Sequence, residues 1–492
     1  MVFFFLLSGL FLGWSFGAKD TANVFGTAVE SRMLAFKRAA LICAVFVTLG
    51  AVLEGSGPSQ TLNRLGVVNA LGGAFTVALA AAITITIMVK LGIPVATTQT
   101  LAGAIIGWNY FAGRLTDFGS LATIASSWLI APLMGCVFAA LLFFIFKRYL
   151  DKTKLHLLEQ DTYTRYGLII VGALGAYALG ANNIANVVGI FVPVTPFRDI
   201  HLPGLGSLSG ETQLYVIGAL SIVLGIYTYS HKIMKTVGKQ LFRLTPITGL
   251  IAVIAETIVL ALFSSQGLHA LFVKMGIPPI PLVPVSASQI IVGSVIGIGI
   301  AKGGKNLRLD MLGRISIGWI TAPVLAFGFS FISLFIVQNV FEQTVLQPSR
   351  YSFDYATLTQ MKAHNIDIKK MYMVNGRMFD KEQTIYTKLK NDAKMQRQDI
   401  LTVIRIAEIN EFTVEIAKVR KQHLEEDLTA EQLQALSTLE GRKYRHRWQL
   451  KNDLAGLPGW QLYEQPSTTL EKEHNKSLET RLDKLARAFL TK

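Results

Sequence analysis

GAKDTANVFGTAV at residues 17–29 and GANNIANVVGIFV at residues 180–192 share seven of thirteen positions at an offset of 163. In both stretches a Gly-Ala pair followed by amide or carboxylate side chains interrupts a long apolar run. Such agreement between two distant stretches indicates that a structural unit was duplicated.

Two further motifs recur in the same order. PVATTQTLAGAIIG at 94–107 matches PVSASQIIVGSVIG at 284–297, and WLIAP at 128–132 matches WITAP at 319–323. The offset grows from 163 to 190 and then 191, so the second copy carries extra residues between its first two motifs. We expect this insertion at residues 264–283.

The composition is that of a membrane protein with an appended polar region. Hydrophobic residues make up 51% of the 492 residues and charged residues only 16%, against about 25% in soluble proteins. Residues 1–341 hold 33 charged side chains, whereas 342–492 hold 46. We therefore expect an all-α polytopic membrane protein with a soluble, mostly helical C-terminal domain at 342–492, and with transmembrane repeats at 1–165 and 166–341.

Apolar runs divide residues 1–341 into about ten membrane segments, since roughly 20 residues cross the hydrocarbon core. The approximate segments are 2–29, 39–56, 67–89, 94–110, 120–146, 166–192, 210–229, 244–266, 281–301 and 315–341. Basic loops are retained inside, which places the N-terminus and the C-terminal domain outside. Four segments separate the first from its copy, so the two run in opposite directions, as in the inverted repeats of secondary transporters.

Several classes of function are excluded by what the sequence lacks. The net charge of +15 comes largely from short loops between apolar runs, which argues for membrane topology and against nucleic-acid binding. The two cysteines, Cys43 and Cys136, lie in apolar runs and offer no disulfide framework. No catalytic arrangement and no nucleotide-binding loop is recognisable, so we expect neither an enzyme nor an ATP-driven pump.

The first motif places polar side chains inside membrane segments. They are Lys19, Asp20 and Asn23 in one copy and Asn182, Asn183 and Asn186 in the other. Hydrocarbon does not tolerate such groups, which must face protein, ions or water. Carboxylate and amide oxygens suit a hard cation, so the expected cation ligands are Asp20, Asn23, Asn183 and Asn186. The alternative is that the amides are interhelical hydrogen-bond partners and the neighbouring glycines are packing residues.

The second motif combines proline, hydroxyl groups and glutamine. Its candidate substrate-binding residues are Thr97, Thr98 and Gln99 after Pro94, and Ser286, Ser288 and Gln289 after Pro284. Proline starts a helix well, and the first N–H groups of a helix are unpaired and attract anions. Two such helix beginnings from opposite directions suit a tetrahedral oxyanion. The alternative is a proline kink capped by hydroxyl side chains.

Taken together, these motifs resemble the duplicated signature of the inorganic phosphate transporter (PiT) family, over residues 1 to about 341. The resemblance implies a cation-coupled symporter for inorganic phosphate in the cell membrane, with inverted repeats and re-entrant hairpins near the anion site. It also implies no cofactor beyond the coupling cation. Position by position, the polar members of the signature are matched by Asp20, Asn23, Asn183 and Asn186, and its hydroxyl cluster by Thr97, Thr98, Ser286 and Ser288.

The chain departs from the family pattern at four positions. Lys19 stands where the family has asparagine, Asn183 where it has aspartate, and Gln99 and Gln289 where it has histidine. The loss of a carboxylate leaves the number of coupling cations open, and the loss of both histidines favours sodium over the proton. Lys19 either attracts the anion or pairs with Asp20 or Glu30, and we favour pairing.

Other questions remain open from the sequence. Asp20 favours phosphate over sulfate because phosphate still has a proton to donate, yet another oxyanion permease, or a receptor or scaffold with a degenerate transporter core, stays an alternative. Glu256, in an apolar run, is either a coupling residue or a structural carboxyl group. The expected partners are phosphate, sodium or a proton and the lipid bilayer; self-association into a homo-oligomer stays open.

Overall fold

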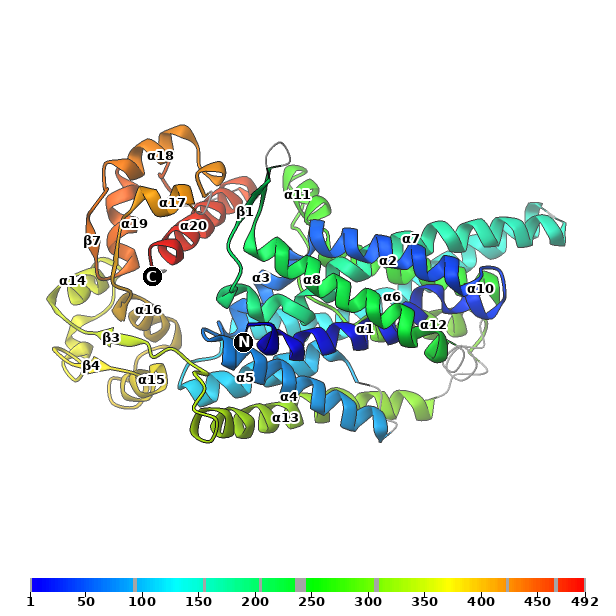
Figure 1. Cartoon of the computed structure of the whole chain (residues 1–492), viewed down its shortest axis with the longest axis horizontal. Helices are drawn as coiled ribbons and strands as arrows, with labels where there is room; N and C mark the ends of the chain where they lie inside the picture. Colours follow the sequence, from blue (N-terminus) through cyan, green and yellow to red (C-terminus); the bar gives the residue numbers. More distant parts are fainter. Residues whose placement is uncertain are drawn as a thin grey trace.

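The computed structural model describes residues 2–91, 95–153, 156–202, 206–234, 245–304, 309–421, 424–463 and 468–490. In the first half of the membrane unit the helices are α1 (Val2–Glu30), α2 (Phe36–Glu54), α3 (Ser56–Leu65), α4 (Leu71–Lys90), α5 (Thr97–Ala112) and α6 (Phe118–Thr153). The second half contains α7 (Leu157–Val188), η1 (Gly189–Val194), α8 (Gly210–Gly225), η2 (Ile226–Ser230), α10 (Pro246–Ser264), α11 (Gln266–Lys274), α12 (Ala287–Ala301) and α13 (Leu309–Asn339). Figure 1 shows these helices as one elongated bundle.

The predicted all-α polytopic architecture is confirmed. Eight helices in the described residues are long and apolar enough to cross a membrane. Two more segments, α5 and α12, have only 16 and 15 residues, fewer than the roughly 20 that a full crossing needs. Both begin beside polar residues of α7 rather than at an end of the bundle, so the ten expected segments comprise eight long helices and two short ones.

The two repeats interleave, and the most extensive contacts between helices of different halves have counterparts with the halves exchanged. Helix α2 packs on α7 while α8 packs on α1, and α5 packs on α13 while α12 packs on α6. Likewise α4 contacts α13 and α10 contacts α6. One large apolar core therefore runs through both halves, from Leu6 in α1 to Val345 beyond α13, and a smaller one lies between α6, α10 and α12.

Glycines in the repeated motifs allow these exchanged helix pairs to approach closely. A Cβ atom at Gly180 would lie 2.0 Å from the carbonyl oxygen of Val47, and one at Gly17 would lie 1.8 Å from that of Ile222. Helix α1 runs unbroken through Gly17, so this glycine serves close packing and does not unwind the helix. Helix α7 tightens only at Gly189, into the 3-10 turn η1.

The extra length of the second half lies in two places, so the prediction of a single insertion is corrected. The expected stretch does contain α11, which has no helical counterpart between α4 and α5 among the described residues. A second addition is the hairpin of β1 (Ile200–Leu202) and β2 (Gly206–Leu208), inserted between η1 and α8. Both additions lie at the end of the bundle that faces the C-terminal domain (Figure 1).

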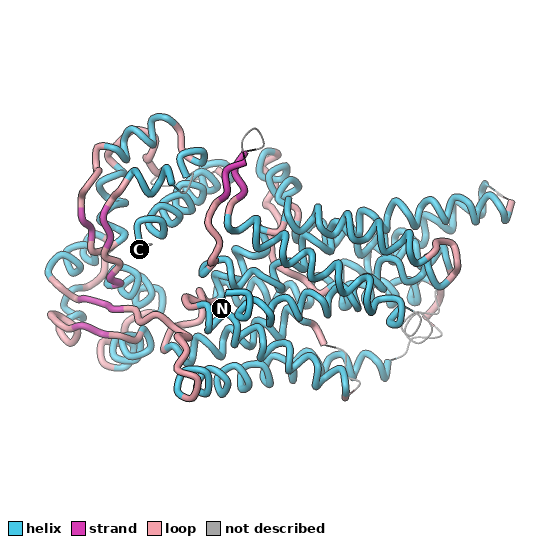
Figure 2. Tube along the Cα trace, in the orientation of Figure 1, coloured by secondary structure: helices cyan, strands magenta, loops and turns pink. Residues whose placement is uncertain are grey.

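The C-terminal domain is mostly helical, as expected, with short strands (Figure 2). Its first unit contains β3 (Arg350–Ser352), α14 (Tyr355–Ala363), η3 (Ile368–Met371), β4 (Met378–Phe379), α15 (Glu382–Asn391), α16 (Arg397–Ala407) and β5 (Glu408–Ile409). Its second contains β6 (Phe412–Thr413), α17 (Ile416–Lys421), η4 (Leu424–Asp427), α18 (Ala430–Ser437), β7 (Lys443–Tyr444), α19 (Arg447–Ala455) and α20 (Thr469–Leu490). Each unit has its own apolar core.

These two units repeat one another locally, which the sequence analysis missed. In the first, Gly376 N–H donates to Phe353 O at 2.8 Å, and in the second Gly441 N–H donates to Val414 O at 2.9 Å. Both glycines have a positive φ, 69° and 77°, in the left-handed region that favours glycine. The two units therefore share this backbone arrangement at the turn before β4 and β7.

The C-terminal domain lies at the same end of the bundle as the N-terminus (Figure 1). This placement agrees with an even number of crossings between the two. The domain is attached to the connection between α5 and α6 by a hydrogen bond of 2.8 Å from Leu115 N–H to Glu382 Oε2. Its helix α20 also contacts α11. That this end faces outward stays a prediction from the basic loops.

Candidate functional site

The polar residues of the repeated motifs converge on one turn of α7. Asn182 and Asn186 are four residues apart in this helix and so lie on the same face, one above the other. Asn182 bonds to the segment that leads into α12, and Asn186 bonds to the first turn of α5. The two short helices, predicted from separate halves of the sequence, thus begin next to each other.

Asn182 fixes the segment before α12. Its Nδ2 donates to the carbonyl oxygen of Val285 at 2.7 Å, and its Oδ1 accepts from the N–H of Val285 at 2.7 Å. This paired bond imitates the pairing of a β-strand and holds the chain just before the helix. Sequence analysis placed Asn182 among the buried polar groups but gave it no role.

The beginning of α5 is held by two side chains. Asn186 Nδ2 donates to Thr98 Oγ1 at 3.2 Å, and Lys19 Nζ donates to Thr97 Oγ1 at 3.2 Å. Both threonines and Gln99 are buried. The proline expected to start this helix, Pro94, lies outside the described residues, whereas Pro284 precedes α12 as expected.

Neither short helix is capped by a side chain in the described part of the chain. The N-cap residues are Ala96 for α5 and Ser286 for α12, and neither makes a side-chain cap hydrogen bond. The first N–H groups of both helices are therefore available to a ligand. Ser286 and Ser288 are partly exposed at the beginning of α12, while Gln289 is buried in its first turn.

Asp20 connects the first motif to its copy. Its Oδ2 accepts from Asn183 Nδ2 at 3.0 Å, and its Oδ1 lies 3.8 Å from Lys19 Nζ. The pairing of Lys19 is thus with Asp20. Glu30 lies eleven residues further along the unbroken helix, about 16 Å away at 1.5 Å per residue.

Several buried polar atoms at this site have no hydrogen-bond partner among the described residues. They are Asp20 Oδ1, Asn23 Nδ2, Gln99 Oε1 and Nε2, Asn186 Oδ1 and Gln289 Nε2. A buried polar group left unpaired costs about 1–3 kcal/mol, and the cost is higher in a membrane interior. Their number in one place indicates a site that receives polar ligands or water.

Glu256 belongs to the same region. It lies in α10, is fully buried, and both of its carboxyl oxygens lack a partner within the described residues. It is close enough to Asp20 for the two carboxyl groups to interact electrostatically. The structure therefore brings Glu256 to the predicted cation residues, although it lies 236 positions from Asp20 in the sequence.

No group of three or more histidine, cysteine, aspartate or glutamate side chains that could hold a metal ion occurs in the described ranges. The donor set at the site is the Asp20 carboxylate, with the Glu256 carboxyl group nearby, together with amides and hydroxyl groups. Such hard oxygen ligands suit a weakly held alkali cation and differ from the ligands of zinc or iron.

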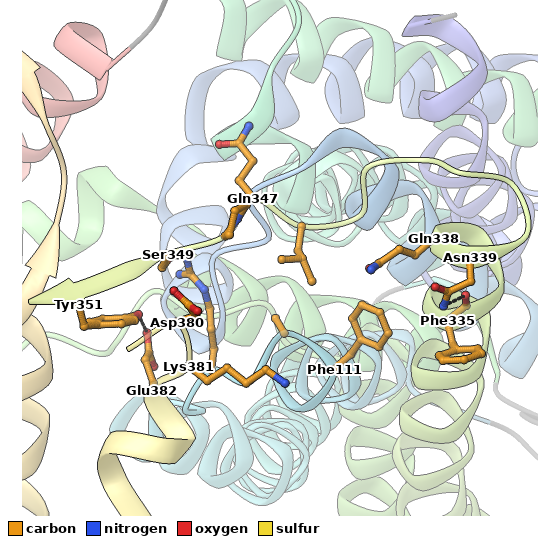
Figure 3. A pocket seen from close by; sticks show the side chains of 14 residues that line it. Phe111, Phe335, Gln338, Asn339, Gln347, Ser349, Tyr351, Asp380, Lys381 and Glu382 are labelled. Atoms are coloured by element: carbon orange, nitrogen blue, oxygen red, sulfur yellow. Dashed lines mark hydrogen bonds between the residues drawn. The ribbon is translucent and has the colours of Figure 1, made fainter. Parts of the chain in front are cut away.

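A cavity of about 380 Å³ lies at the junction of the membrane unit and the C-terminal domain (Figure 3). Lys381 points towards Phe111 across it, and Glu382 at its edge accepts from Tyr351 Oη at 2.7 Å. None of the predicted site residues lines this cavity. Since Glu382 also accepts from Leu115 N–H, we read the junction as an attachment of the two parts.

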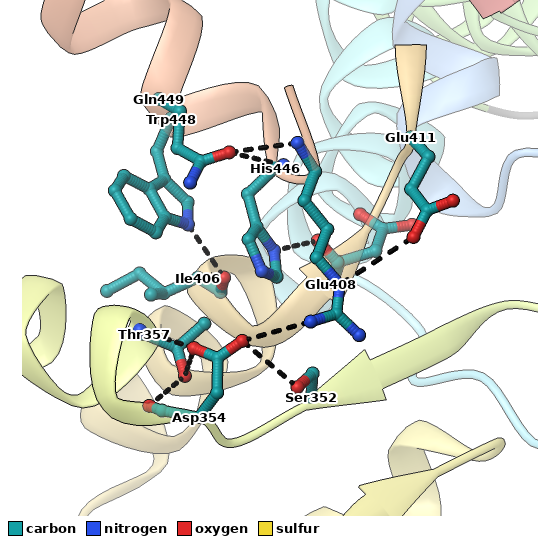
Figure 4. A network of polar contacts seen from close by, with 10 residues as sticks. Ser352, Asp354, Thr357, Ile406, Glu408, Glu411, His446, Trp448 and Gln449 are labelled. Carbon is teal, nitrogen blue, oxygen red and sulfur yellow. Dashed lines mark hydrogen bonds and ion pairs between the residues drawn. The ribbon is translucent and has the colours of Figure 1, made fainter. Parts of the chain in front are cut away.

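A polar network joins the two units of the C-terminal domain (Figure 4). His446 is 1% exposed, and its Nδ1 lies 2.7 Å from the carbonyl oxygen of Glu408. Trp448 Nε1 donates to Ile406 O at 2.9 Å, and Arg445 pairs with Asp354 at 3.3 Å. Burial lowers the pKa of His446 from its usual value of 6.5.

Comparisons with known proteins identify the family of the chain. The model of the phosphate transporter family matches residues 16–270 and 280–479, and so continues past residue 341, where the resemblance in the sequence was expected to end. A "putative phosphate permease" of Methanocaldococcus jannaschii is 26% identical over 327 residues, which cover 66% of this chain and 95% of the relative. A protein of the same description from Haemophilus influenzae is 25% identical over 421 residues, covering 68% and 96%.

A solved structure described as a sodium-dependent phosphate transporter shares the fold, with a TM-score of 0.54 and 21% identity. The similarity covers 68% of this chain and 98% of that structure. About a third of the present chain therefore has no counterpart in the solved structure. On the strength of the family match across most of its length, this chain belongs to the phosphate transporter family and is a multi-pass membrane protein.

Proposed function

We propose that the protein is a cation-coupled symporter for inorganic phosphate, with sodium favoured over the proton, and that it works by alternating access. Membership of the phosphate transporter family supports the substrate. The description of the solved fold neighbour, a sodium-dependent phosphate transporter, agrees with the coupling ion.

The observation that carries the proposal is the meeting of α5 and α12 at α7. The N-termini of α5 and α12, one from each half of the chain, have no side-chain cap in the described residues and present their first N–H groups towards one region. Helix N-termini bind phosphate-like anions through these groups and through the helix dipole. The Nε2 atoms of Gln99 and Gln289, which have no hydrogen-bond partner in the described part of the chain, add neutral donors for phosphate oxygens.

The cation half of the proposed site lies beside the anion half. Asp20 Oδ1 and Asn186 Oδ1 are buried acceptors without a hydrogen-bond partner among the described residues. Asn186 contributes to both halves, because its Nδ2 bonds to Thr98 at the beginning of α5. A cation bound to these oxygens therefore moves Asn186, the residue that also holds the beginning of α5 in the anion half. This shared residue couples the binding of the two ions.

Sodium is favoured over the proton because neither copy of the second motif contains histidine. Glutamine occupies both positions of the second motif at which the resembling family has histidine, and glutamine does not titrate. Glu256 is the remaining candidate for a coupling carboxyl group near Asp20. We assign it a supporting role, because nothing in the first half of the chain corresponds to it.

The interleaved helix pairs support alternating access. Transporters with inverted repeats expose a fixed central site to either side by moving one helix bundle against the other. Here α4, α5 and α13 form one group and α6, α10 and α12 form its exchanged counterpart. The proposed site lies where the first turns of α5 and α12, one helix from each group, meet α7.

Radiolabelled phosphate uptake into proteoliposomes tests the proposal. Uptake should require an inward sodium gradient, persist when a proton gradient is abolished, and resist competition by sulfate. Sulfate competition at equal concentration would establish the oxyanion permease instead. Full absence of uptake from a folded preparation would favour a receptor or scaffold, and Ser286→Ala with Ser288→Ala should weaken phosphate binding if the site is correct.

A further inference from the structure

Lys19 and Asn182 occupy the same place in the two copies of the first motif, yet they make different contacts. The Asn182 amide bonds to both backbone groups of Val285. A lysine ammonium can donate but cannot accept, so Lys19 cannot repeat this paired bond. It reaches instead to Thr97 Oγ1, at 3.2 Å, at the beginning of α5.

The ammonium group of Lys19 thereby lies between the two halves of the proposed site. It is 3.8 Å from Asp20 Oδ1 on one side and within hydrogen-bonding distance of Thr97 on the other. The Phe16 ring, 5.4 Å away, adds a favourable aromatic contact for a cation. The Lys19 side chain is 26% exposed, whereas that of Asp20 is 6% exposed, so the positive charge lies on the more open side of the carboxylate.

The two oxygens of the Asp20 carboxylate have different surroundings: Oδ2 accepts a hydrogen bond, whereas Oδ1 has none among the described residues and faces an ammonium group. Asn183 donates to Oδ2, and Lys19 faces Oδ1, the oxygen left free for a cation. The equivalent of Asp20 in the second copy is the neutral Asn183. The two motif copies together therefore carry one positive and one negative charge, and a mobile cation at Asp20 must compete with a cation attached to the chain.

We propose that Lys19 is a tethered cation that takes the place of one transported sodium ion. The inference rests on the proposed function of cation-coupled phosphate symport and concerns its stoichiometry. A lysine at this place supplies the positive charge between carboxylate and phosphate without leaving the protein. The symporter thus moves one sodium ion fewer per phosphate than it would with asparagine at position 19, and phosphate binding depends less on sodium.

A purely structural ion pair between Lys19 and Asp20 makes a different prediction. Such a pair would affect folding or expression, but its removal would leave the number of transported sodium ions unchanged. The ratio of sodium to phosphate therefore separates the two roles. The natural replacement is asparagine, the residue at the equivalent position 182.

The test measures sodium and phosphate uptake by double isotope labelling in proteoliposomes. Lys19→Asn should raise the sodium-to-phosphate ratio by one and steepen the dependence of uptake on sodium concentration. Lys90→Asn, which removes an exposed charge at the end of α4, is the control and should leave the ratio unchanged. An unchanged ratio in a transporting Lys19→Asn variant would overturn the proposal.

Sodium-dependent thermal stability provides a readout that does not need transport. In detergent, sodium should raise the Tm of Lys19→Asn more than that of the wild type, with potassium as the control salt. Equal shifts in both proteins would also overturn the proposal. If Lys19→Asn does not fold, Lys19→Gln, which keeps a longer amide side chain, is measured in the same way. Should the wild type fail to carry phosphate, the proposed function falls, while the stability comparison still decides the role of Lys19.

Discussion

Asn182→Ala is the substitution whose consequences the structure defines most closely. The side chain is fully buried and makes three hydrogen bonds, two to the backbone of Val285 and one from Nδ2 to Asn183 Oδ1 at 2.9 Å. Alanine removes all three and leaves the N–H and carbonyl groups of Val285 unpaired. At about 0.5–1.5 kcal/mol for each lost bond, we expect a loss of roughly 2–4 kcal/mol in stability.

Asn109→Ala is a matched control at the other end of α5. Asn109 is 1% exposed and donates from Nδ2 to Leu65 O at 3.0 Å and to Thr116 Oγ1 at 3.1 Å. Its loss should cost a similar amount of stability, because a buried amide with backbone and side-chain partners is removed in both cases. None of its partners belongs to the proposed phosphate site.

Phosphate affinity should separate the two variants. Asn182→Ala frees the segment before α12, and we expect one hydrogen bond between this helix N-terminus and phosphate to be lost. Such a bond is worth about 1.4 kcal/mol, so phosphate affinity should fall roughly tenfold. Asn109→Ala should leave phosphate affinity within about a factor of two. Thermal unfolding in detergent measures stability, and calorimetric titration with phosphate measures affinity. Equal losses of phosphate affinity in both variants would refute the assignment of the site to the beginning of α12.

Four further predictions concern other parts of the molecule. Asp20→Asn should abolish sodium-dependent uptake while the protein stays folded, and normal sodium dependence in uptake assays would contradict the cation site. Gly180→Ala should prevent folding, since its Cβ would lie 2.0 Å from a carbonyl oxygen, whereas Gly26→Ala, whose Cβ would lie 3.9 Å from its nearest neighbour, should be neutral or slightly stabilising in thermal unfolding. Because burial lowers the pKa of His446, the unfolded chain takes up this proton first, and the C-terminal domain should lose stability as the pH falls through and below about 6.5; a His446→Asn variant with an undiminished pH dependence would exclude this residue as the cause. A chain ending at Gln347 should still transport phosphate in proteoliposomes, since the repeats close before that residue; a well-folded truncation without uptake would show that the C-terminal domain is needed.

The duplicated motifs made the architecture predictable from the sequence. Polar residues in an apolar segment stand out because hydrocarbon penalises them, and their recurrence at a fixed spacing identifies two equivalent halves. The first membrane segment and its copy lie an odd number of segments apart, so they cross the membrane in opposite directions. This implies an inverted repeat. The family comparison and the helices of the structure confirm this fold.

The pairing of side chains within the site was not predictable in the same way. Asn183 bonds to Asp20 from 163 positions away, and Asn182 bonds to Val285 from 103 positions away. Such contacts depend on the way in which α7 crosses the other helices, and no local pattern encodes that. The similarity of the two C-terminal units was also hidden, because it rests on backbone bonds at Gly376 and Gly441 and on few shared residue types.

The contrast between symmetric helices and asymmetric charges has a consequence for the transport cycle. Under the proposed alternating access, the exchanged helix contacts, α2 with α7 and α8 with α1, would provide similar packing for two arrangements related by the inverted repeat. The charges do not follow this symmetry, because Lys19 and Asp20 belong to α1, whereas their counterparts in α7 are the neutral amides Asn182 and Asn183. The two arrangements therefore differ in electrostatic energy even where their packing is alike. A ligand shifts such an equilibrium only through its different affinity for the two states, so we expect sodium and phosphate to act mainly at the charged half, at α1 and the beginning of α5.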